Sequence, residues 1–227
     1  MSAAVVTGAS RGIGRATALA LARRGLDVAL LARTSEDLSW VAREVSACGV
    51  KALPLRCNVT SEPDVSAACA RVLERFGPPA VLVNNAGMIR RGLVHEMPVE
   101  DFRLVVDTNL GGTFLVTRAL LPSMLERKTG RVIQVASISS TLGAARASAY
   151  CAAKWGIIGF TKSLAEELRG TGLSTMSVLP GSVETAMLEG SGFAPQMSAE
   201  EVAGTIVYAA LDAPAAMNGS SIEMFGP

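Results

Sequence analysis

The stretch Thr7-Gly8-Ala9-Ser10-Arg11-Gly12-Ile13-Gly14 follows an apolar run, 3–7, and opens a helical pattern that closes at Gly25. The first glycine can adopt a backbone angle that a side chain opposes, and the other two carry no Cβ atom to block a pyrophosphate. The N-terminus of the following helix offers unpaired N–H groups and partial positive charge to an anion. A plain strand-to-helix turn uses similar residues, but the first βα turn is where dinucleotide sites form. We therefore expect nucleotide contacts from Gly8, Ser10, Arg11, Gly12, Ile13 and Gly14.

Outside this turn, short apolar runs alternate with amphipathic stretches along the whole chain. Runs rich in Val, Ile and Leu without strict alternation are typical of strands buried on both faces. Repeated strand–helix–strand order predicts a Rossmann-type, doubly wound parallel sheet of about seven strands, with helices on both faces. We expect one dinucleotide-binding and catalytic domain over residues 1–227. The runs are Ala3–Thr7, Val28–Leu31, Ala52–Leu55, Val81–Val83, Val132–Val135, Thr175–Leu179 and Ser221–Phe225.

Several helix ends are also visible in the sequence. A capping-box spacing joins Thr34 with Asp37, Ser61 with Asp64, and Ser198 with Glu201. A long helical stretch, 99–127, is expected to end at Gly130.

Composition excludes several classes of function. The 227 residues carry a formal net charge of +1, with dispersed basic residues, so we expect no nucleic-acid partner. His95 is the only histidine and the four cysteines form no CxxC pair, which argues against a metal site. The N-terminus lacks a signal-peptide pattern, and we take the longest apolar candidate, Val202–Leu211, for a buried helix rather than a membrane span. A cytoplasmic protein is expected.

The residue after the second apolar run bears on the choice of nucleotide. An acidic residue there holds the ribose 2′-hydroxyl of NAD in this type of fold. The sequence instead has Arg33, followed by Thr34, and Arg11 can reach the same region. A guanidinium suits the phosphate of NADP, although Arg33 can also be an ordinary solvated charge. We predict NADP(H) as the cofactor.

Tyr150 and Lys154 are four residues apart and share one face if the segment is helical. A phenol of pKa about 10 exchanges protons poorly near neutrality, and a nearby ammonium favours the phenolate. Such pairs also occur on ordinary helix surfaces, so the case rests on coincidence with the nucleotide turn. Ser137 follows the fifth apolar run, where a hydroxyl can bind a substrate carbonyl oxygen, although Ser139 and Ser140 leave the assignment open.

Taken together, these residues resemble the short-chain dehydrogenase/reductase family in its single-domain form. The likeness covers nearly the whole chain. It includes the glycine turn, Asn84-Asn85-Ala86-Gly87, Asn109, the trio Ser137, Tyr150 and Lys154, and Pro180-Gly181-Ser182-Val183-Glu184-Thr185. The resemblance resolves the choice among the serines in favour of Ser137.

The resemblance implies a role for each of these positions. Tyr150 gives a proton to the carbonyl oxygen, Ser137 orients that oxygen, and Lys154 lowers the pKa of the tyrosine and holds the nicotinamide ribose. Asn109 fixes a water that links Lys154 to solvent. The resemblance further implies cofactor contacts from Asn85, Ala86, Gly87, Pro180, Gly181, Val183 and Thr185, besides Tyr150 and Lys154. It also implies a homodimer or homotetramer, assembled through the long helices.

Two departures from the family pattern affect the expectations. Asn58, before Val59, replaces the usual aspartate, and its amide can hydrogen-bond adenine as donor and acceptor. The expected substrate lid, 186–198, is short, and the C-terminal segment 221–227 lacks the paired glycines common in acyl-carrier-protein ketoreductases. Both the short lid and the missing glycines argue against a substrate carried by an acyl carrier protein. Met88, Met187 and Met217 can line a pocket, but core packing is the better default.

We predict an NADPH-dependent enzyme that reduces a small-molecule ketone or aldehyde to an alcohol, or the reverse. The alternative is a non-catalytic NADP(H)-binding sensor or scaffold with the same fold. The set Asn109, Ser137, Tyr150 and Lys154 argues against a sensor, because nucleotide binding alone needs no proton transfer.

Overall fold

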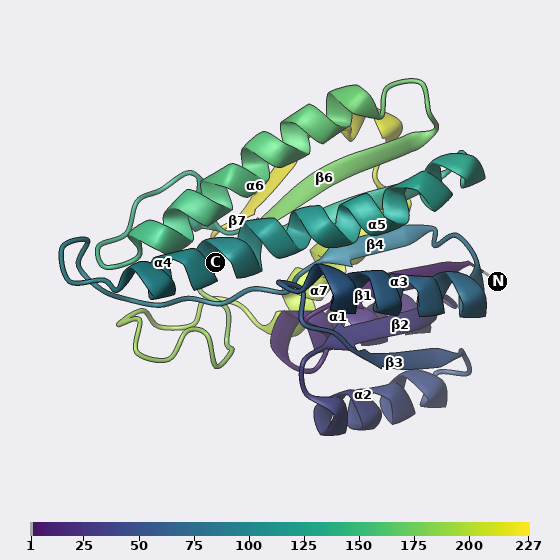
Figure 1. Cartoon of the computed structure of the whole chain (residues 1–227), viewed down its shortest axis with the longest axis horizontal. Helices are drawn as coiled ribbons and strands as arrows, with labels where there is room; N and C mark the ends of the chain where they lie inside the picture. The colour runs from purple at the N-terminus through teal and green to yellow at the C-terminus, as the bar shows by residue number, and fades with distance from the viewer. Residues whose placement is uncertain (1) are drawn as a thin grey trace.

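A computed structural model describes residues 2–227, and within them seven strands form one sheet in the order β3-β2-β1-β4-β5-β6-β7. All neighbouring strands are parallel. The strand order changes direction between β1 and β4, as the doubly wound prediction requires (Figure 1). The strands are β1 (Ala3–Thr7), β2 (Asp27–Ala32), β3 (Ala52–Arg56), β4 (Val81–Asn84), β5 (Gly130–Val135), β6 (Leu173–Pro180) and β7 (Ser221–Met224).

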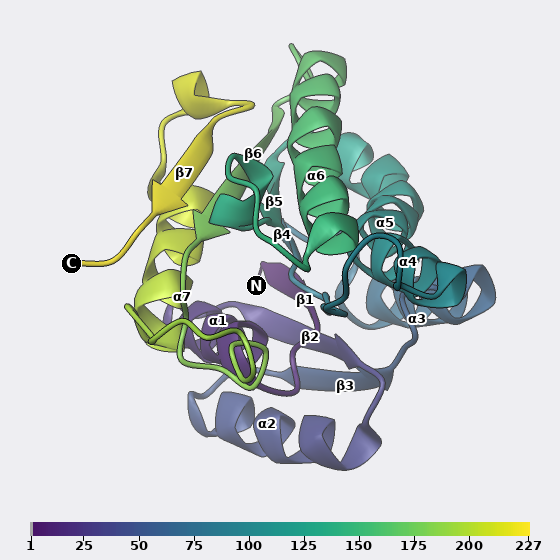
Figure 2. The same cartoon turned by 90° about the vertical axis from the view of Figure 1, so that its left-hand side faces the viewer.

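Helices cover both faces of the sheet, which confirms the expected layers (Figure 2). One face carries α1 (Gly12–Arg23), α2 (Ser35–Ala47) and α7 (Ala199–Val207). The other face carries α3 (Glu62–Phe76), α4 (Val99–Val106), α5 (Gly112–Arg127) and α6 (Ser148–Glu167). The central strands β1, β2, β4 and β6 are buried throughout because helices pack on both of their sides, whereas the edge strands β3 and β7 remain partly exposed.

The predicted helix ends are confirmed in part. Gly25 has a φ of 82° just after α1, and Ser198 and Glu201 form a full capping box on α7. Ser61 caps α3 by accepting from the backbone N–H of Asp64. The capping box expected at Thr34 is wrong, since its side chain makes no capping hydrogen bond to α2.

The long stretch 99–127 is helical throughout but contains a π-helical turn, Asp107–Gly111, between α4 and α5. Its end differs from the prediction: Lys128, with a φ of 58°, takes the left-handed conformation that ends α5, two residues before Gly130. Among residues 2–227 this helix alone is long and apolar enough to cross a bilayer, by length and composition only, and 44% of its most apolar window is buried. The prediction that Val202–Leu211 is the longest apolar candidate is therefore wrong, because the helix over 99–127 is longer. One such helix is weak evidence for a membrane span.

The carboxyl ends of the strands share one edge of the sheet, and the loops after β1, β4, β5 and β6 gather there (Figure 1). This edge brings the glycine turn, the 85–98 loop, the start of α6 and the 181–198 segment together. Ligands bind at this edge in open α/β sheets.

Candidate functional site

The glycine turn after β1 packs directly against the end of β4. Gly8 has a φ of 64°, and a Cβ atom there would lie 2.9 Å from the Cα of Ala86. Gly12 has a φ of 53°, and a Cβ atom would meet only Thr185, 3.2 Å away. A Cβ on Gly14 would collide with the carbonyl oxygen of Gly8 and lie 2.5 Å from Asn85 Nδ2. Gly14 therefore makes room for the turn's own backbone, which corrects the expectation that it clears space for pyrophosphate.

Asn85 holds this turn in place. Its Nδ2 donates to the carbonyl oxygens of Thr7, at 2.9 Å, and of Gly8, at 3.3 Å. In return, Thr7 Oγ1 accepts from the backbone N–H groups of Asn85 and Ala86, both at 3.0 Å. The Asn85 side chain thus faces the turn, and its contribution to the site is to position the glycines.

The residues expected near the adenine end lie around the ends of β2 and β3. Arg11, Arg33 and Thr34 are exposed, and within residues 2–227 neither arginine forms an ion pair with a carboxylate. Asn58 Oδ1 accepts from the backbone N–H and the hydroxyl of Thr60, at 3.3 and 3.0 Å. Its acceptor is thereby engaged, so only the amide donor suits adenine, which corrects the expected double contact.

Val59 is 7% exposed, and its side chain packs under α5. A Cβ on Gly112 would lie 2.6 Å from Val59 Cγ2, so glycine at this position permits the close approach. The side chain of Val59 therefore supports the wall of the site, and a cofactor contact is left to its backbone.

The structure brings Ser137, Tyr150 and Lys154 to the same edge, and all three side chains are buried. Tyr150 and Lys154 lie on the buried face of α6, with Lys154 Nζ 5.5 Å from the centre of the phenol ring. Lys154 Nζ also donates to the carbonyl oxygen of Val135 at 2.8 Å. Ser137 lies two residues after β5, where its Oγ accepts from the backbone N–H of Ser139 and donates to the carbonyl oxygen of Pro180.

Burial dominates the protonation of this pair. It raises the pKa of Tyr150 to about 12, while the Ser137 hydroxyl and the Arg91 charge act in the opposite direction. Burial also lowers the pKa of Lys154 to about 7. Burial of both groups therefore opposes the expected acidification of the phenol by Lys154, because a buried lysine loses much of its own charge.

Asn109 lies in the π-helical turn and is fully buried. Its Nδ2 donates to the carbonyl oxygens of Met88, at 2.7 Å, and Val105, at 2.8 Å. Its Oδ1 has no hydrogen-bond partner within residues 2–227, and a Cβ on Gly87 would lie 2.7 Å from that oxygen and 3.6 Å from Lys154 Nζ. A buried acceptor without a partner fits a bound water.

The segment after β6 runs over these residues. Gly181 donates its backbone N–H to Met224 at 2.8 Å, and Val183 pairs with Met197. Met187 then reaches the site, with its Sδ 4.0 Å from the Tyr150 hydroxyl. Core packing was the default prediction for Met187, but the side chain is 40% exposed and contacts Tyr150, which favours the alternative that it lines a pocket.

Arg91, which the sequence did not single out, lies in the loop after β4. Its guanidinium donates to the carbonyl oxygens of Met187, at 3.3 Å, and Glu189, at 3.4 Å. Two adjacent arginines, Arg90 and Arg91, just after the NNAG-like element were the only sequence signal.

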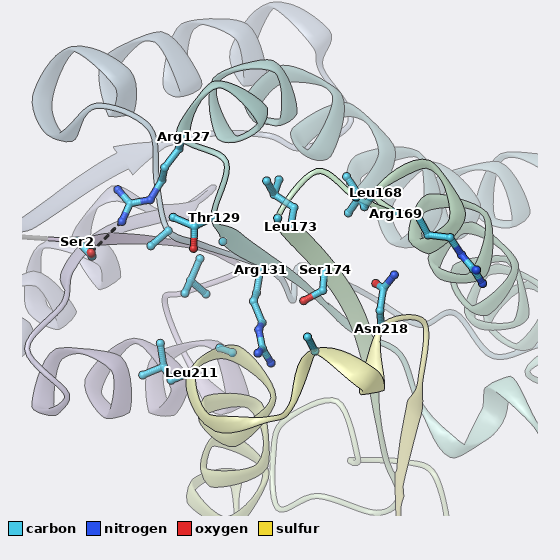
Figure 3. A pocket seen from close by; sticks show the side chains of 17 residues that line it. Ser2, Arg127, Thr129, Arg131, Leu168, Arg169, Leu173, Ser174, Leu211 and Asn218 are labelled. Atoms are coloured by element: carbon cyan, nitrogen blue, oxygen red, sulfur yellow. Dashed lines mark hydrogen bonds between the residues drawn. The ribbon is translucent and has the colours of Figure 1, made fainter.

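A cavity of about 640 Å³ lies at the opposite edge of the sheet, at the amino ends of β4, β5 and β6 (Figure 3). Arg131 crosses it to donate to the carbonyl oxygens of Ala209 and Ala213, and Arg127 donates to the hydroxyl of Ser2. Arg169 pairs with Glu166 instead. Because the arginines are directed to separate partners, the cavity has no converging site, and the full length of β5 separates it from Ser137.

Comparisons with known proteins identify the family to which this fold and sequence are similar. Residues 2–196 match the family model of short chain dehydrogenase. A 3-oxoacyl-[acyl-carrier-protein] reductase of Synechocystis sp. is 41% identical, covering 98% of this chain and 95% of that protein. The corresponding reductase of Escherichia coli, FabG, is 35% identical over the same shares.

Solved structures show the same likeness. A short-chain type dehydrogenase/reductase from Mycobacterium marinum matches with a TM-score of 0.94 and 33% identity, covering 99% of this chain and 94% of that one. A variant of actinorhodin polyketide ketoreductase, solved with NADPH, matches with a TM-score of 0.94 and 36% identity, covering 99% and 96%. The alternative of a non-catalytic sensor finds no support among these relatives, which are described as reductases or dehydrogenases.

Proposed function

The chain belongs to the short-chain dehydrogenase/reductase family, and from this premise we propose that it is an NADP(H)-dependent enzyme that interconverts a carbonyl compound and an alcohol. The observation that carries the proposal is the buried group of Ser137, Tyr150 and Lys154 at the carboxyl edge of the sheet. A phenol, an amine and a hydroxyl gathered there can manage one proton beside a bound nucleotide.

The residues at the carboxyl edge fit a dinucleotide phosphate. The first turn of α1, which contains no acidic residue and begins at Gly12, suits the pyrophosphate. Arg11 and Arg33 are exposed guanidinium groups that can bind the 2′-phosphate. Gly8, Ser10, Ile13, Thr34, Ala86, Gly87, Pro180, Gly181, Val183 and Thr185 complete the proposed cofactor contacts. The solved ketoreductase with NADPH supports this choice of cofactor.

In the proposed reduction, Tyr150 is the proton donor. Its pKa of about 12 keeps the hydroxyl protonated at neutral pH, as a donor requires. Ser137 hydrogen-bonds the same carbonyl oxygen and fixes its position. The nicotinamide, when bound, supplies the hydride that adds to the carbonyl carbon. The hydroxyl proton passes to the oxygen, so the carbonyl gains two hydrogens and becomes an alcohol.

Lys154 and Asn109 restore the proton in this proposal. An ammonium at Lys154 favours the phenolate left after transfer, and Lys154 also binds the nicotinamide ribose. A water on the unpartnered Oδ1 of Asn109 can return a proton toward Lys154, since Gly87 leaves the space between them free. With a pKa of about 7, Lys154 can both lose and regain a proton near neutrality.

The relatives indicate a substrate class. Two of them are named as reductases of 3-oxoacyl groups, so we propose a ketone with a 3-oxoacyl pattern as the substrate. The short lid and the missing C-terminal glycine pair argue against an acyl carrier protein as its carrier, so the proposal covers the 3-oxo carbonyl and not the carrier. Residues 186–198 serve as the substrate lid in this single-domain arrangement. We further propose a homodimer or homotetramer through the long helices, because Phe102, Phe114 and Trp155 are 43%, 48% and 53% exposed there. Light scattering of the purified protein tests the assembly.

The activity is tested with a panel of aldehydes, ketones, 3-oxo esters and quinones, by following NADPH absorbance. Turnover of at least one carbonyl class, with NADPH preferred over NADH, is the expected result. Tight NADPH binding without turnover of any member would contradict an enzyme of this type.

A further inference from the structure

Arg91 links the loop after β4 to the segment over Tyr150. Its two hydrogen bonds, to the carbonyl oxygens of Met187 and Glu189, are long, at 3.3 and 3.4 Å. Within residues 2–227 no carboxylate lies within ion-pair distance of Arg91. A guanidinium has five N–H donors and binds carboxylates through pairs of hydrogen bonds. The Arg91 guanidinium therefore keeps N–H donors that can bind an additional anion.

The neighbouring arginine gives a contrast. Arg90 lies 3.6 Å from the carboxylate of Asp101, at the start of α4, and contacts nothing in the 184–198 segment through a hydrogen bond or ion pair. Both arginines are exposed. Of the two, therefore, only Arg91 combines contact with this segment and a charge that no carboxylate neutralises.

Met187 lies against the Tyr150 hydroxyl, where a substrate oxygen is expected to bind. Its Sδ is a hydrogen-bond acceptor for that hydroxyl at 4.0 Å, whereas a carbonyl oxygen that receives a proton must come within about 2.7 Å of it. A substrate oxygen that replaces Met187 as the acceptor displaces the thioether. Gly190 and Gly192 follow the Arg91 contacts, with φ values of 68° and 80°, and the wide range of backbone angles open to glycine permits movement there.

We propose that Arg91 is a specificity-determining residue: it holds Met187 over Tyr150 in the resting protein, and it exchanges the two carbonyl oxygens for a carboxylate of the incoming substrate. The inference rests on the proposed carbonyl reduction and adds a negatively charged group to the substrate class. A carboxylate replaces two weak contacts by a charge-assisted pair, which releases Met187 at the moment of binding. A neutral carbonyl compound must displace the same contacts without that gain.

The test uses acetoacetate and its neutral methyl ester, which share the 3-oxo carbonyl. NADPH oxidation is measured for the wild type, R91M and the matched control R90M, which removes the same charge from the adjacent position. We expect R91M to lower kcat/KM for acetoacetate by about tenfold or more, the loss of one charge-assisted contact. For the ester, kcat/KM should rise rather than fall, because R91M also removes the contacts that hold Met187 over Tyr150. R90M should leave the ratio between the two substrates unchanged. An equal effect of R91M on both, or the same shift in R90M, would overturn the proposal.

A second measurement does not depend on turnover. Hydrogen exchange of the 186–191 amides in the NADPH complex should quicken when acetoacetate is added to the wild type, but not when the ester is added. In R91M exchange should be fast from the start, and R91K, which keeps the charge without the planar fork, should lie between. Unchanged exchange in R91M would refute the inference, even if carbonyl reduction is confirmed. The predicted exchange pattern without turnover of any carbonyl would refute only the proposed function.

Discussion

Lys154 Nζ lies 5.5 Å from the centre of the Tyr150 ring, on the buried face of one helix. The amine is held by the carbonyl oxygen of Val135, a neutral partner that compensates a charge only in part. Burial therefore lowers the pKa of Lys154 to about 7. Burial also keeps the Tyr150 phenol protonated. Above pH 7 an uncharged amine therefore lies beside a protonated phenol, and the charge of a bound cofactor can change this protonation.

This relationship predicts a dependence of stability on pH. The folded protein releases the Lys154 proton near pH 7, whereas the unfolded chain keeps it up to about pH 10.5. Because the unfolded state then binds more protons, the free energy of unfolding should rise with pH above 7, by up to about 1.4 kcal/mol per pH unit. Urea unfolding between pH 7 and 8.5, without cofactor, measures the slope.

The control for this experiment is K154M, which keeps an unbranched side chain and removes the titration. Its stability should exceed that of the wild type at pH 7, and the difference should shrink as the pH rises. Burial raises the pKa values of the Cys57 and Cys69 thiols to about 11 and 12. Neither thiol therefore titrates in the folded protein between pH 7 and 8.5, the range of the experiment. Parallel pH profiles for the two proteins would show that Lys154 remains charged.

The glycine turn yields a prediction about packing. G14A should destabilise the protein by about 1–3 kcal/mol or more, because the new methyl group meets the Gly8 carbonyl oxygen and Asn85. G204A is the matched control in α7, where a Cβ meets nothing within 4 Å, and it should stabilise by about 0.5–1 kcal/mol. Thermal unfolding of both variants decides. Equal stability of G14A and wild type would mean that the turn relaxes freely.

Nucleotide preference should depend on Arg33. R33A is expected to raise the dissociation constant for NADPH by about 10- to 100-fold, since it removes charge-assisted hydrogen bonds to the 2′-phosphate. The dissociation constant for NADH should stay within about threefold, a small change on the free-energy scale. Fluorescence titration of both nucleotides measures this, with R43A on the exposed side of α2 as control. Equal weakening of both nucleotides would assign Arg33 another role.

Sequence patterns predicted the sheet and the shared helix face of Tyr150 and Lys154 because both depend on local regularities. Buried strands read as apolar runs, and the four-residue spacing of Tyr150 and Lys154 fixes their shared helix face once a helix forms. The capping box at Ser198 was equally visible, since its partners lie three residues apart.

Contacts between distant segments were beyond such patterns. Gly14 leaves room not only for the nearby Gly8 carbonyl oxygen but also for Asn85 Nδ2, which folding brings over from the end of β4. Met187 and Arg91 meet only because the loops after β4 and β6 share one edge of the sheet. The protonation of Lys154 likewise depends on how completely the finished fold excludes water, a quantity that spacing does not encode.

If the Tyr150 hydroxyl delivers the proton during reduction, Y150F should slow the chemical step itself. Rapid mixing of the NADPH-bound protein with a carbonyl compound that the wild type reduces measures the first turnover. This first-turnover rate should be about 10²- to 10⁴-fold lower in Y150F, with the dissociation constant for NADPH nearly unchanged. A first-turnover rate in Y150F close to that of the wild type would mean that another group donates the proton.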